Sequence, residues 1–212
     1  MKQIFKSREP KSLLQYRNNV DAIYDGPNFT PVKSDIRESL LKEQGYLCAY
    51  CMRRISINRM KIEHFLCQKS NPDEQLNYSN LLGCCEGGEG SRPAEQTCDT
   101  KKGSKVLTFS PVTLTINTLI TYSSSGLIES THKQFSIELN DVLNLNKIRL
   151  KENRAAAQEG IEELLNSRAG KRSKAELKIM IDKYINVSAD GKFKEYYGCI
   201  IFYLRKKHSK AK

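Results

Sequence analysis

Leu47-Cys48-Ala49-Tyr50-Cys51 opens the stretch that decides the fold, and Cys98-Asp99-Thr100-Lys101-Lys102-Gly103 closes it. Between them lies Ile62-Glu63-His64, an acidic residue followed by the first of only three histidines in the chain. Six of the seven cysteines lie between positions 48 and 98. Thiols on both sides of an acid–histidine pair indicate one metal that holds the fold together and a second site where the histidine performs chemistry.

The composition is that of a soluble, basic protein. The 212 residues can form one globular domain, or a small domain with a helical extension. No apolar run approaches the length of about 20 residues that crosses a bilayer, and the basic first residues are not followed by the apolar segment of an export signal. We therefore expect a cytoplasmic protein without membrane contact.

The cysteine count and the net charge indicate what the protein binds. An odd number of cysteines in a reducing compartment favours metal ligation over disulfides. The net charge of +11 favours nucleic acid as a partner, although solubility alone could also explain it.

The sequence pattern predicts an α+β fold. Residues 1–33 are polar and predict an N-terminal arm that packs on a partner or on the main domain. Asp35 and Glu38 have the spacing of a capping box, which predicts a helix over residues 36–44. Residues 53–56 and 60–63 are expected to pair as a short antiparallel hairpin, and a short helix is expected to begin at Cys98.

Beyond Gly103 the character of the sequence changes. Residues 106–109, 114–122 and 127–129 have β composition, with a turn over residues 123–126. The pattern turns helical from residue 139. A capping box at Ser173 and Glu176 opens one helix, and a further buried helix is expected over residues 196–204. We expect three parts: an arm (1–33), a catalytic module (34–105), and a β-hairpin with a mainly helical region that packs on the module or on a partner (106–212).

The residue types of the central stretch suit phosphodiester hydrolysis. An imidazole with its ordinary pKa of about 6.5 can take a proton from water at neutral pH, which makes His64 a candidate general base. Glu63 and Asp99 can hold a divalent cation that stabilises charge on the phosphate and on the leaving oxygen. Asn80 can fix the loop that carries His64 through hydrogen bonds to its backbone, and Lys102 can point its charge at a phosphate.

These residues resemble a known family. The segments Leu47-Cys48-Ala49-Tyr50-Cys51, Ile62-Glu63-His64-Phe65, Tyr78-Ser79-Asn80-Leu81-Leu82 and Cys98-Asp99-x-x-Lys102-Gly103 look like the HNH (ββα-metal) endonucleases. More narrowly, they are similar to the PtuB-like nucleases of Septu-type anti-phage systems, some of which are associated with retrons. The match covers about a quarter of the chain, residues 47–103.

The resemblance implies a role for each residue. His64 is the general base, Glu63 before it is a ligand of Mg²⁺ or another divalent cation, and Asn80 orients the base. Asp99 stands where the family has a metal-binding histidine, and as an acid it remains a plausible oxygen ligand. The fold implied is a zinc-stapled ββα-metal module.

The resemblance also implies which thiols hold the structural zinc. The ligands are expected to be Cys48, Cys51, Cys85 and Cys98. The spacing from Asn80 favours Cys85, with Cys84 as the competitor. Twelve residues separate Cys85 from Cys98, where the family usually has two.

The predicted function is metal-dependent endonuclease activity as the effector of an anti-phage defence complex, on DNA or RNA. The partners implied by the family are an ABC/SMC-like ATPase and, as a further candidate, a retron reverse transcriptase with its RNA–DNA hybrid. Two alternatives remain open: a non-catalytic zinc-knuckle subunit that binds nucleic acid or the ATPase, and a ribonuclease acting on tRNA.

Overall fold

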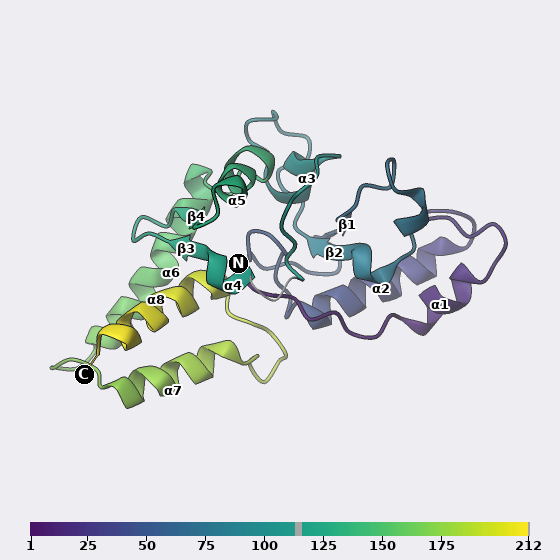
Figure 1. Ribbon diagram of the computed structural model, residues 1–212. Helices are drawn as coiled ribbons and strands as arrows, with labels where there is room; N and C mark the ends of the chain where they lie inside the picture. The colour runs from purple at the N-terminus through teal and green to yellow at the C-terminus, as the bar shows by residue number, and fades with distance from the viewer. Residues whose placement is uncertain (113–115, 212) are drawn as a thin grey trace.

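A computed structural model describes residues 1–112 and 116–211 and has the α+β composition that the sequence predicts (Figure 1). The helices are α1 (Lys11–Arg17), α2 (Phe29–Glu43), α3 (Cys98–Lys102), α4 (Ile116–Leu119), α5 (Lys133–Ile137), α6 (Ile148–Asn166), α7 (Lys174–Ile185) and α8 (Tyr197–Lys210), and the strands are β1 (Lys61–His64), β2 (Leu81–Cys84), β3 (Ile120–Tyr122) and β4 (Ile128–Ser130). Short 3₁₀ turns span Pro72–Glu74 and Tyr78–Asn80, and a π-helical turn spans Glu138–Val142. In the described part of the chain, every helix is too short or too polar to span a bilayer.

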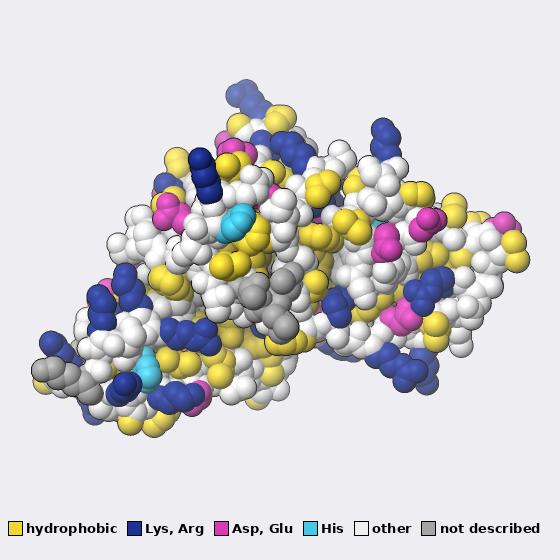
Figure 2. Space-filling model, viewed as in Figure 1, with side chains coloured by type: hydrophobic (Ala, Val, Ile, Leu, Met, Phe, Trp, Pro, Cys, Tyr) yellow, Lys and Arg dark blue, Asp and Glu magenta, His cyan; other side chains and the backbone are white. Residues whose placement is uncertain are grey.

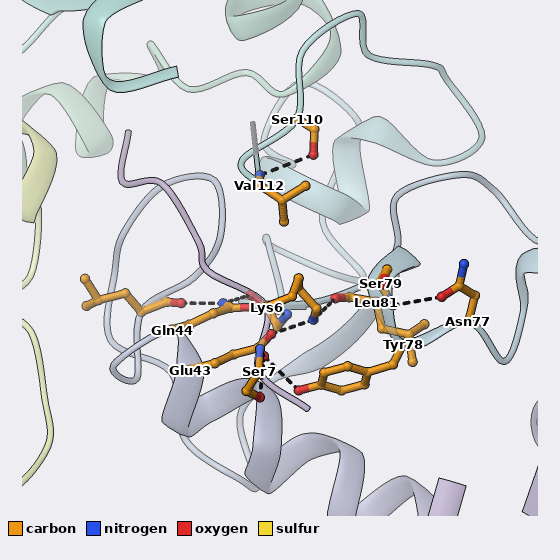
Figure 3. Close-up of polar contacts among 12 residues, drawn as sticks. Lys6, Ser7, Glu43, Gln44, Asn77, Tyr78, Ser79, Leu81, Ser110 and Val112 are labelled. Carbon is orange, nitrogen blue, oxygen red and sulfur yellow. Dashed lines mark hydrogen bonds and ion pairs between the residues drawn. The ribbon is translucent and has the colours of Figure 1, made fainter. Parts of the chain in front are cut away.

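The N-terminal segment packs on the rest of the chain. The backbone N–H of Ile4 donates to the carbonyl of Pro111 at 2.8 Å. Figure 3 shows that the carboxylate of Glu43, at the end of α2, accepts hydrogen bonds from the ammonium of Lys6 at 2.5 Å and from the hydroxyl of Tyr78 at 3.0 Å. These contacts fasten the segment beside β2, because Lys6 also donates to the carbonyl of Leu81.

Helix α2 begins earlier than predicted, at Phe29, so Asp35 lies in the helix interior and the expected capping box there is wrong. Pro31 is tolerated because it lies in the first turn, where backbone N–H groups have no partner within the helix. Apolar side chains then face the core at helical spacing; they are Phe29, Val32, Ile36, Leu40 and Leu41.

Strand β1 pairs antiparallel with β2, with Ile62 opposite Gly83 and His64 opposite Leu81. The predicted hairpin between residues 53–56 and 60–63 is therefore wrong. All four residues of β2 are buried, so this apolar strand competes better for the core-facing edge than a segment with two arginines. Arg54 instead donates to the carbonyls of Gly45 and Phe193.

The region after Gly103 has fewer strands than its composition suggests. Residues 106–109 form no strand, and residues 116–119 form α4, whereas β3 and β4 pair as expected. Residues 114 and 115 of the predicted strand lie outside the described residues. The turn over residues 123–126 is confirmed, and it requires Gly126 because the φ angle there is +74° and a Cβ atom would lie 2.0 Å from the carbonyl of Lys151.

The predicted helical region is confirmed. Ser173 and Glu176 form both hydrogen bonds of a capping box at the start of α7. Helices α6, α7 and α8 share a second apolar cluster of Ile161, Leu165, Leu177, Ile181, Ile200 and Leu204, next to the main core. In Figure 1 these helices lie at one end of the molecule, and α1, α2, β1 and β2 lie at the other. The three-part domain division stays a prediction.

Candidate active site and metal centre

Four buried thiols converge where the central segments meet. The sulfur atoms of Cys48, Cys51, Cys85 and Cys98 all lie within 4.8 Å of one another. A tetrahedral zinc with Zn–S bonds of about 2.3 Å separates its sulfur ligands by about 3.8 Å, and the sulfur atoms of Cys51 and Cys85 are 3.7 Å apart. The donor set and its spacing therefore fit a zinc ion.

The cluster contains Cys85, the thiol that the spacing favoured, and not Cys84. The segment between Cys85 and Cys98 folds back on itself, because the N–H of Thr97 donates to the carbonyl of Gly87 at 2.8 Å. The long insertion therefore still returns Cys98, the first residue of α3, to the other three thiols. Cys67 and Cys199 lie outside the cluster.

The pKa values of the buried thiols indicate that a cation would stabilise their ionised form. Burial opposes ionisation of Cys48, yet hydrogen bonds from the surrounding thiols hold its pKa well below the ordinary value. The pKa of Cys98 is raised well above the ordinary value by its hydrogen bond to Cys48. The thiolate of Cys48 thus opposes the ionisation of Cys98, and a bound cation would balance the charge of such thiolates.

Glu63 is buried on β1, with 2% of its surface exposed. Its carboxylate lies 2.8 Å from the ammonium of Lys102 and accepts a hydrogen bond from the hydroxyl of Tyr50 at 3.1 Å. Burial, together with a hydrogen bond to Asp99 and its charge, raises the pKa of Glu63 to about 9, against the opposing charge of Lys102. Two neighbouring carboxyl groups, one of them buried, are a place where a divalent cation can bind.

Lys102, which the sequence predicted to point its charge at a phosphate, is buried inside the protein. It is 1% exposed, and its ammonium lies between Glu63 and the carbonyl of His64, at 3.5 Å from the latter. Asp99 is partly exposed and lies 3.4 Å from the ammonium of Lys61. The structure therefore brings together the two acids, with Lys102 behind them.

His64 ends β1 and is 9% exposed. Its Nε2 lies 3.0 Å from the backbone carbonyl of Gln75. A carbonyl only accepts, so the neutral imidazole carries its proton on Nε2 and keeps a lone pair on Nδ1. Burial lowers the pKa of His64, against the carbonyl of Gln75, which raises it. The imidazole is therefore a neutral acceptor at pH 7.

Asn80 holds the loop that follows His64. Its Oδ1 accepts from the N–H of Leu66 at 2.7 Å, and its Nδ2 donates to the carbonyls of Leu66 and Glu74 at 3.0 and 3.1 Å. Both ends of the loop are thus tied to one amide. Because Gln75 follows Glu74 directly, the carbonyl that orients His64 is fixed by the same side chain.

Two residues beside His64 were not anticipated. The ring of Tyr24 meets the imidazole edge to face, with centroids 4.5 Å apart and planes at 82°. The backbone N–H of Tyr24 donates to the side-chain oxygen of Gln75 at 3.0 Å. Neither residue belongs to a motif, and Tyr24 comes from the segment expected to be an arm, so only the tertiary structure reveals them.

Comparison with known proteins finds similar chains in two bacteria. The chain is 31% identical over 134 residues to a protein of Vibrio cholerae serotype O1 biovar El Tor, named provisionally as the HNH endonuclease of retron Vc95; the alignment covers 58% of this chain and 63% of that protein. It is 29% identical over 120 residues to a protein of Escherichia coli, named provisionally as the HNH endonuclease of retron Ec83, over 48% of this chain and 46% of that protein. The chain thus spans less than two thirds of either relative. No family model matches it. These similarities support a nuclease of the HNH type.

Proposed function

We propose that this protein is an HNH endonuclease that hydrolyses phosphodiester bonds of nucleic acid with the help of a divalent cation. The observation that carries the proposal is the orientation of His64. Its Nε2 is held by a backbone carbonyl, which leaves Nδ1 as the acceptor nitrogen, and the charge of Asp99 acts on this imidazole. Similarity to two retron-associated proteins named as HNH endonucleases supports the same assignment.

His64 acts as the general base, and its Nδ1 takes the proton from the attacking water. Glu63 and Asp99 would hold Mg²⁺ or a similar ion, which supplies charge stabilisation at the phosphate and at the leaving oxygen. Asn80, Gln75 and Tyr24 keep the imidazole in one orientation through the contacts described above.

Lys102 has a different role from the one first expected. Its buried ammonium lies 2.8 Å from Glu63 and keeps that carboxyl group in position. It is therefore a positioning residue rather than a phosphate contact.

The four-thiol cluster holds a structural zinc in this proposal. Cys85 directly follows β2, which pairs with the strand of Glu63 and His64, and Cys98 directly precedes Asp99. Cys48, Cys51, Cys85 and Cys98 would hold the ion, and a zinc bound there would constrain the segment after β2 relative to the start of α3, where Asp99 lies.

The relatives support a retron-associated setting, and the resemblance to PtuB-like nucleases supports the finer proposal. We place the protein in the cytoplasm, as the effector of a Septu-type or retron-associated anti-phage system. An ABC/SMC-like ATPase would control it, and a retron reverse transcriptase with its RNA–DNA hybrid is a further partner.

The test compares His64→Ala with the wild-type protein, alone and in the complex that co-purifies with it. Labelled DNA and total RNA are incubated with each protein in Mg²⁺ or Mn²⁺, and the zinc content is measured in parallel. His132→Ala is the matched control, because His132 is exposed and lies on another element. We expect His64→Ala to keep its zinc and to lose about 100-fold or more of the cleavage rate.

If His64→Ala cleaves as fast as the wild-type protein, His64 is not the general base and the proposed mechanism is wrong. A protein that binds nucleic acid and zinc, but never cuts in the complex, corresponds to the non-catalytic subunit. Cleavage confined to tRNA corresponds to the ribonuclease.

A further inference from the structure

The carboxyl-terminal half of α8 is strongly basic. The helix contains no aspartate or glutamate, and its last six residues include Arg205, Lys206, Lys207 and Lys210, all exposed. Lys207 pairs with Glu162 at 3.4 Å and lies over the ring of Tyr203. Within residues 1–112 and 116–211, the other three cations make no ion pair. We call Arg205, Lys206 and Lys210 the basic ridge.

Hollows with aromatic walls flank the basic ridge. One has a volume of about 470 Å³, and its lining includes Tyr197, Phe202 and Lys206. Another, of about 230 Å³, lies against Phe202 and Tyr203 and is also lined by Lys206 and Lys210. The basic ridge thus stands between surfaces that can accept a flat ring.

Charge is concentrated at this end of the molecule. Figure 2 shows dark-blue side chains gathered over the end of α8, with few magenta ones among them. A third hollow, of about 700 Å³, lies between α8 and the connection from α6 to α7, and it adds Lys171 and Arg172 to the same basic surface. Cations at a helix carboxyl terminus also stabilise the helix dipole, but that role explains neither the aromatic hollows nor the cations of the neighbouring connection.

We propose that the basic ridge binds single-stranded nucleic acid, with phosphates on the three cations and unpaired bases in the flanking aromatic hollows. Proteins that bind single strands without sequence preference combine a basic track with aromatic stacking surfaces in this way. A duplex keeps its bases stacked inside, so it would use the cations but not the hollows.

This anchor is separate from the proposed cleavage site. Helix α8 begins near the middle of the molecule, and its carboxyl-terminal end, which carries the basic ridge, points away from β1, the strand of His64 (Figure 1). Binding can therefore be measured without cleavage, and its outcome does not depend on whether His64 is a general base.

The experiment measures binding of fluorescent single strands of DNA and RNA of about 20 nucleotides, and of the matching DNA duplex, between about 50 and 200 mM salt. All proteins carry His64→Ala, so that no probe is cut. The ridge variant combines Arg205→Ala, Lys206→Ala and Lys210→Ala. The control combines Lys174→Ala, Lys178→Ala and Lys183→Ala, which removes the same charge from exposed positions on α7. Circular dichroism checks that both variants stay folded.

We expect the ridge variant to bind the single strand at least about tenfold more weakly and to reduce the slope of log K against log salt by about 2, since each phosphate contact with a single strand contributes about 0.7. The control should change affinity less than about twofold. Equal losses in both variants, or no loss in the ridge variant, would overturn the basic ridge as the anchor. Equal or tighter binding of the duplex would overturn the preference for single strands.

Phe202→Leu tests the hollows separately, because it removes the ring but keeps an apolar side chain. We expect weaker binding of the single strand by about fivefold or more, from a lost stacking contact of about 1–3 kcal/mol, with an unchanged salt slope. Unchanged affinity would contradict the role of the hollows.

Discussion

At the scale of single residues, the orientation of one imidazole depends on two neighbours that lie outside any motif. The backbone carbonyl of Gln75 accepts a hydrogen bond from Nε2 of His64. The side-chain oxygen of Gln75 accepts another from the backbone N–H of Tyr24. The ring of Tyr24 in turn packs on the imidazole with the two planes nearly perpendicular. The contact uses the ring, and the hydroxyl is not needed for it.

Tyr24→Ala should therefore lower the cleavage rate by about ten- to hundredfold with little change in KM, because a loosened base is rarely aligned with the water. Tyr24→Phe keeps the ring and should retain the rate within about twofold. Single-turnover cleavage and zinc content measure both variants. A rate for Tyr24→Phe as low as that of Tyr24→Ala would show that the hydroxyl, and not the ring, matters.

The buried pair of Glu63 and Lys102 makes a second prediction at this scale. Leaving a buried polar group without its hydrogen-bond partner costs about 1–3 kcal/mol. The pKa of Glu63 is raised to about 9, so at pH 7 its carboxyl group is protonated and meets the ammonium of Lys102 through a hydrogen bond. We expect Lys102→Ala to lower the free energy of unfolding by about 2 kcal/mol, within that range.

Urea unfolding of the zinc-loaded protein measures this change. Lys105→Ala is the control, because Lys105 is a nearby exposed lysine and should change stability by less than about 0.5 kcal/mol. A loss no greater than that of the control would mean that Lys102 does not stabilise the buried acid.

At the scale of elements, the thiol cluster joins segments with little regular structure between them. Cys48 and Cys51 lie on a turn, Cys85 follows β2, and Cys98 begins α3. Strand β2 has four residues and α3 has five, which is too short for either to be stable alone. A bound ion would supply the constraint that their length does not.

Substituting Cys84 and Cys85 one at a time tests which of these neighbouring thiols is the zinc ligand. Cys85→Ser should lower zinc affinity more than about 100-fold, beyond the loss typical of a supporting residue. Cys84→Ser should keep the metal, although its buried hydroxyl costs some stability. Competition with a chromogenic chelator measures both affinities. Retention of zinc by Cys85→Ser and its loss from Cys84→Ser would reverse the assignment.

At the scale of the whole molecule, the hydrophobic core has two parts, and only one of them contains the candidate zinc ligands. The main cluster contains Cys48, Cys51, Cys85 and Cys98 together with side chains from α2, β1–β2 and the N-terminal segment. The smaller cluster between α6, α7 and α8 contains no thiol. Loss of a metal should therefore affect the two ends of the molecule unequally.

We expect a strong chelator to lower the melting temperature of the central part by several degrees or more, since structural zinc contributes directly to folding. Much of the circular dichroism signal of α6–α8 should survive to a higher temperature. Thermal unfolding monitored at 222 nm, with and without chelator, measures both. A single transition unaffected by the chelator would show that no structural metal supports the fold.

The α+β class and the helical carboxyl-terminal region with its capping box at Ser173 could be predicted from local information, namely helical periodicity and capping chemistry. The spacing of Cys48 and Cys51 indicated half of a zinc site, and the resemblance to the HNH endonucleases implied Cys85 and Cys98. The same local information placed His64 at the end of a strand and Cys98 at the start of a helix.

The tertiary structure alone decided the rest. β1 pairs with a strand about 20 residues away rather than with its neighbour, because the fully buried β2 excludes the arginine-bearing segment. Lys102 is buried against Glu63, and Tyr24 reaches His64 from the amino-terminal segment. Pairing between distant segments depends on burial and charge compensation in three dimensions, which no local pattern records.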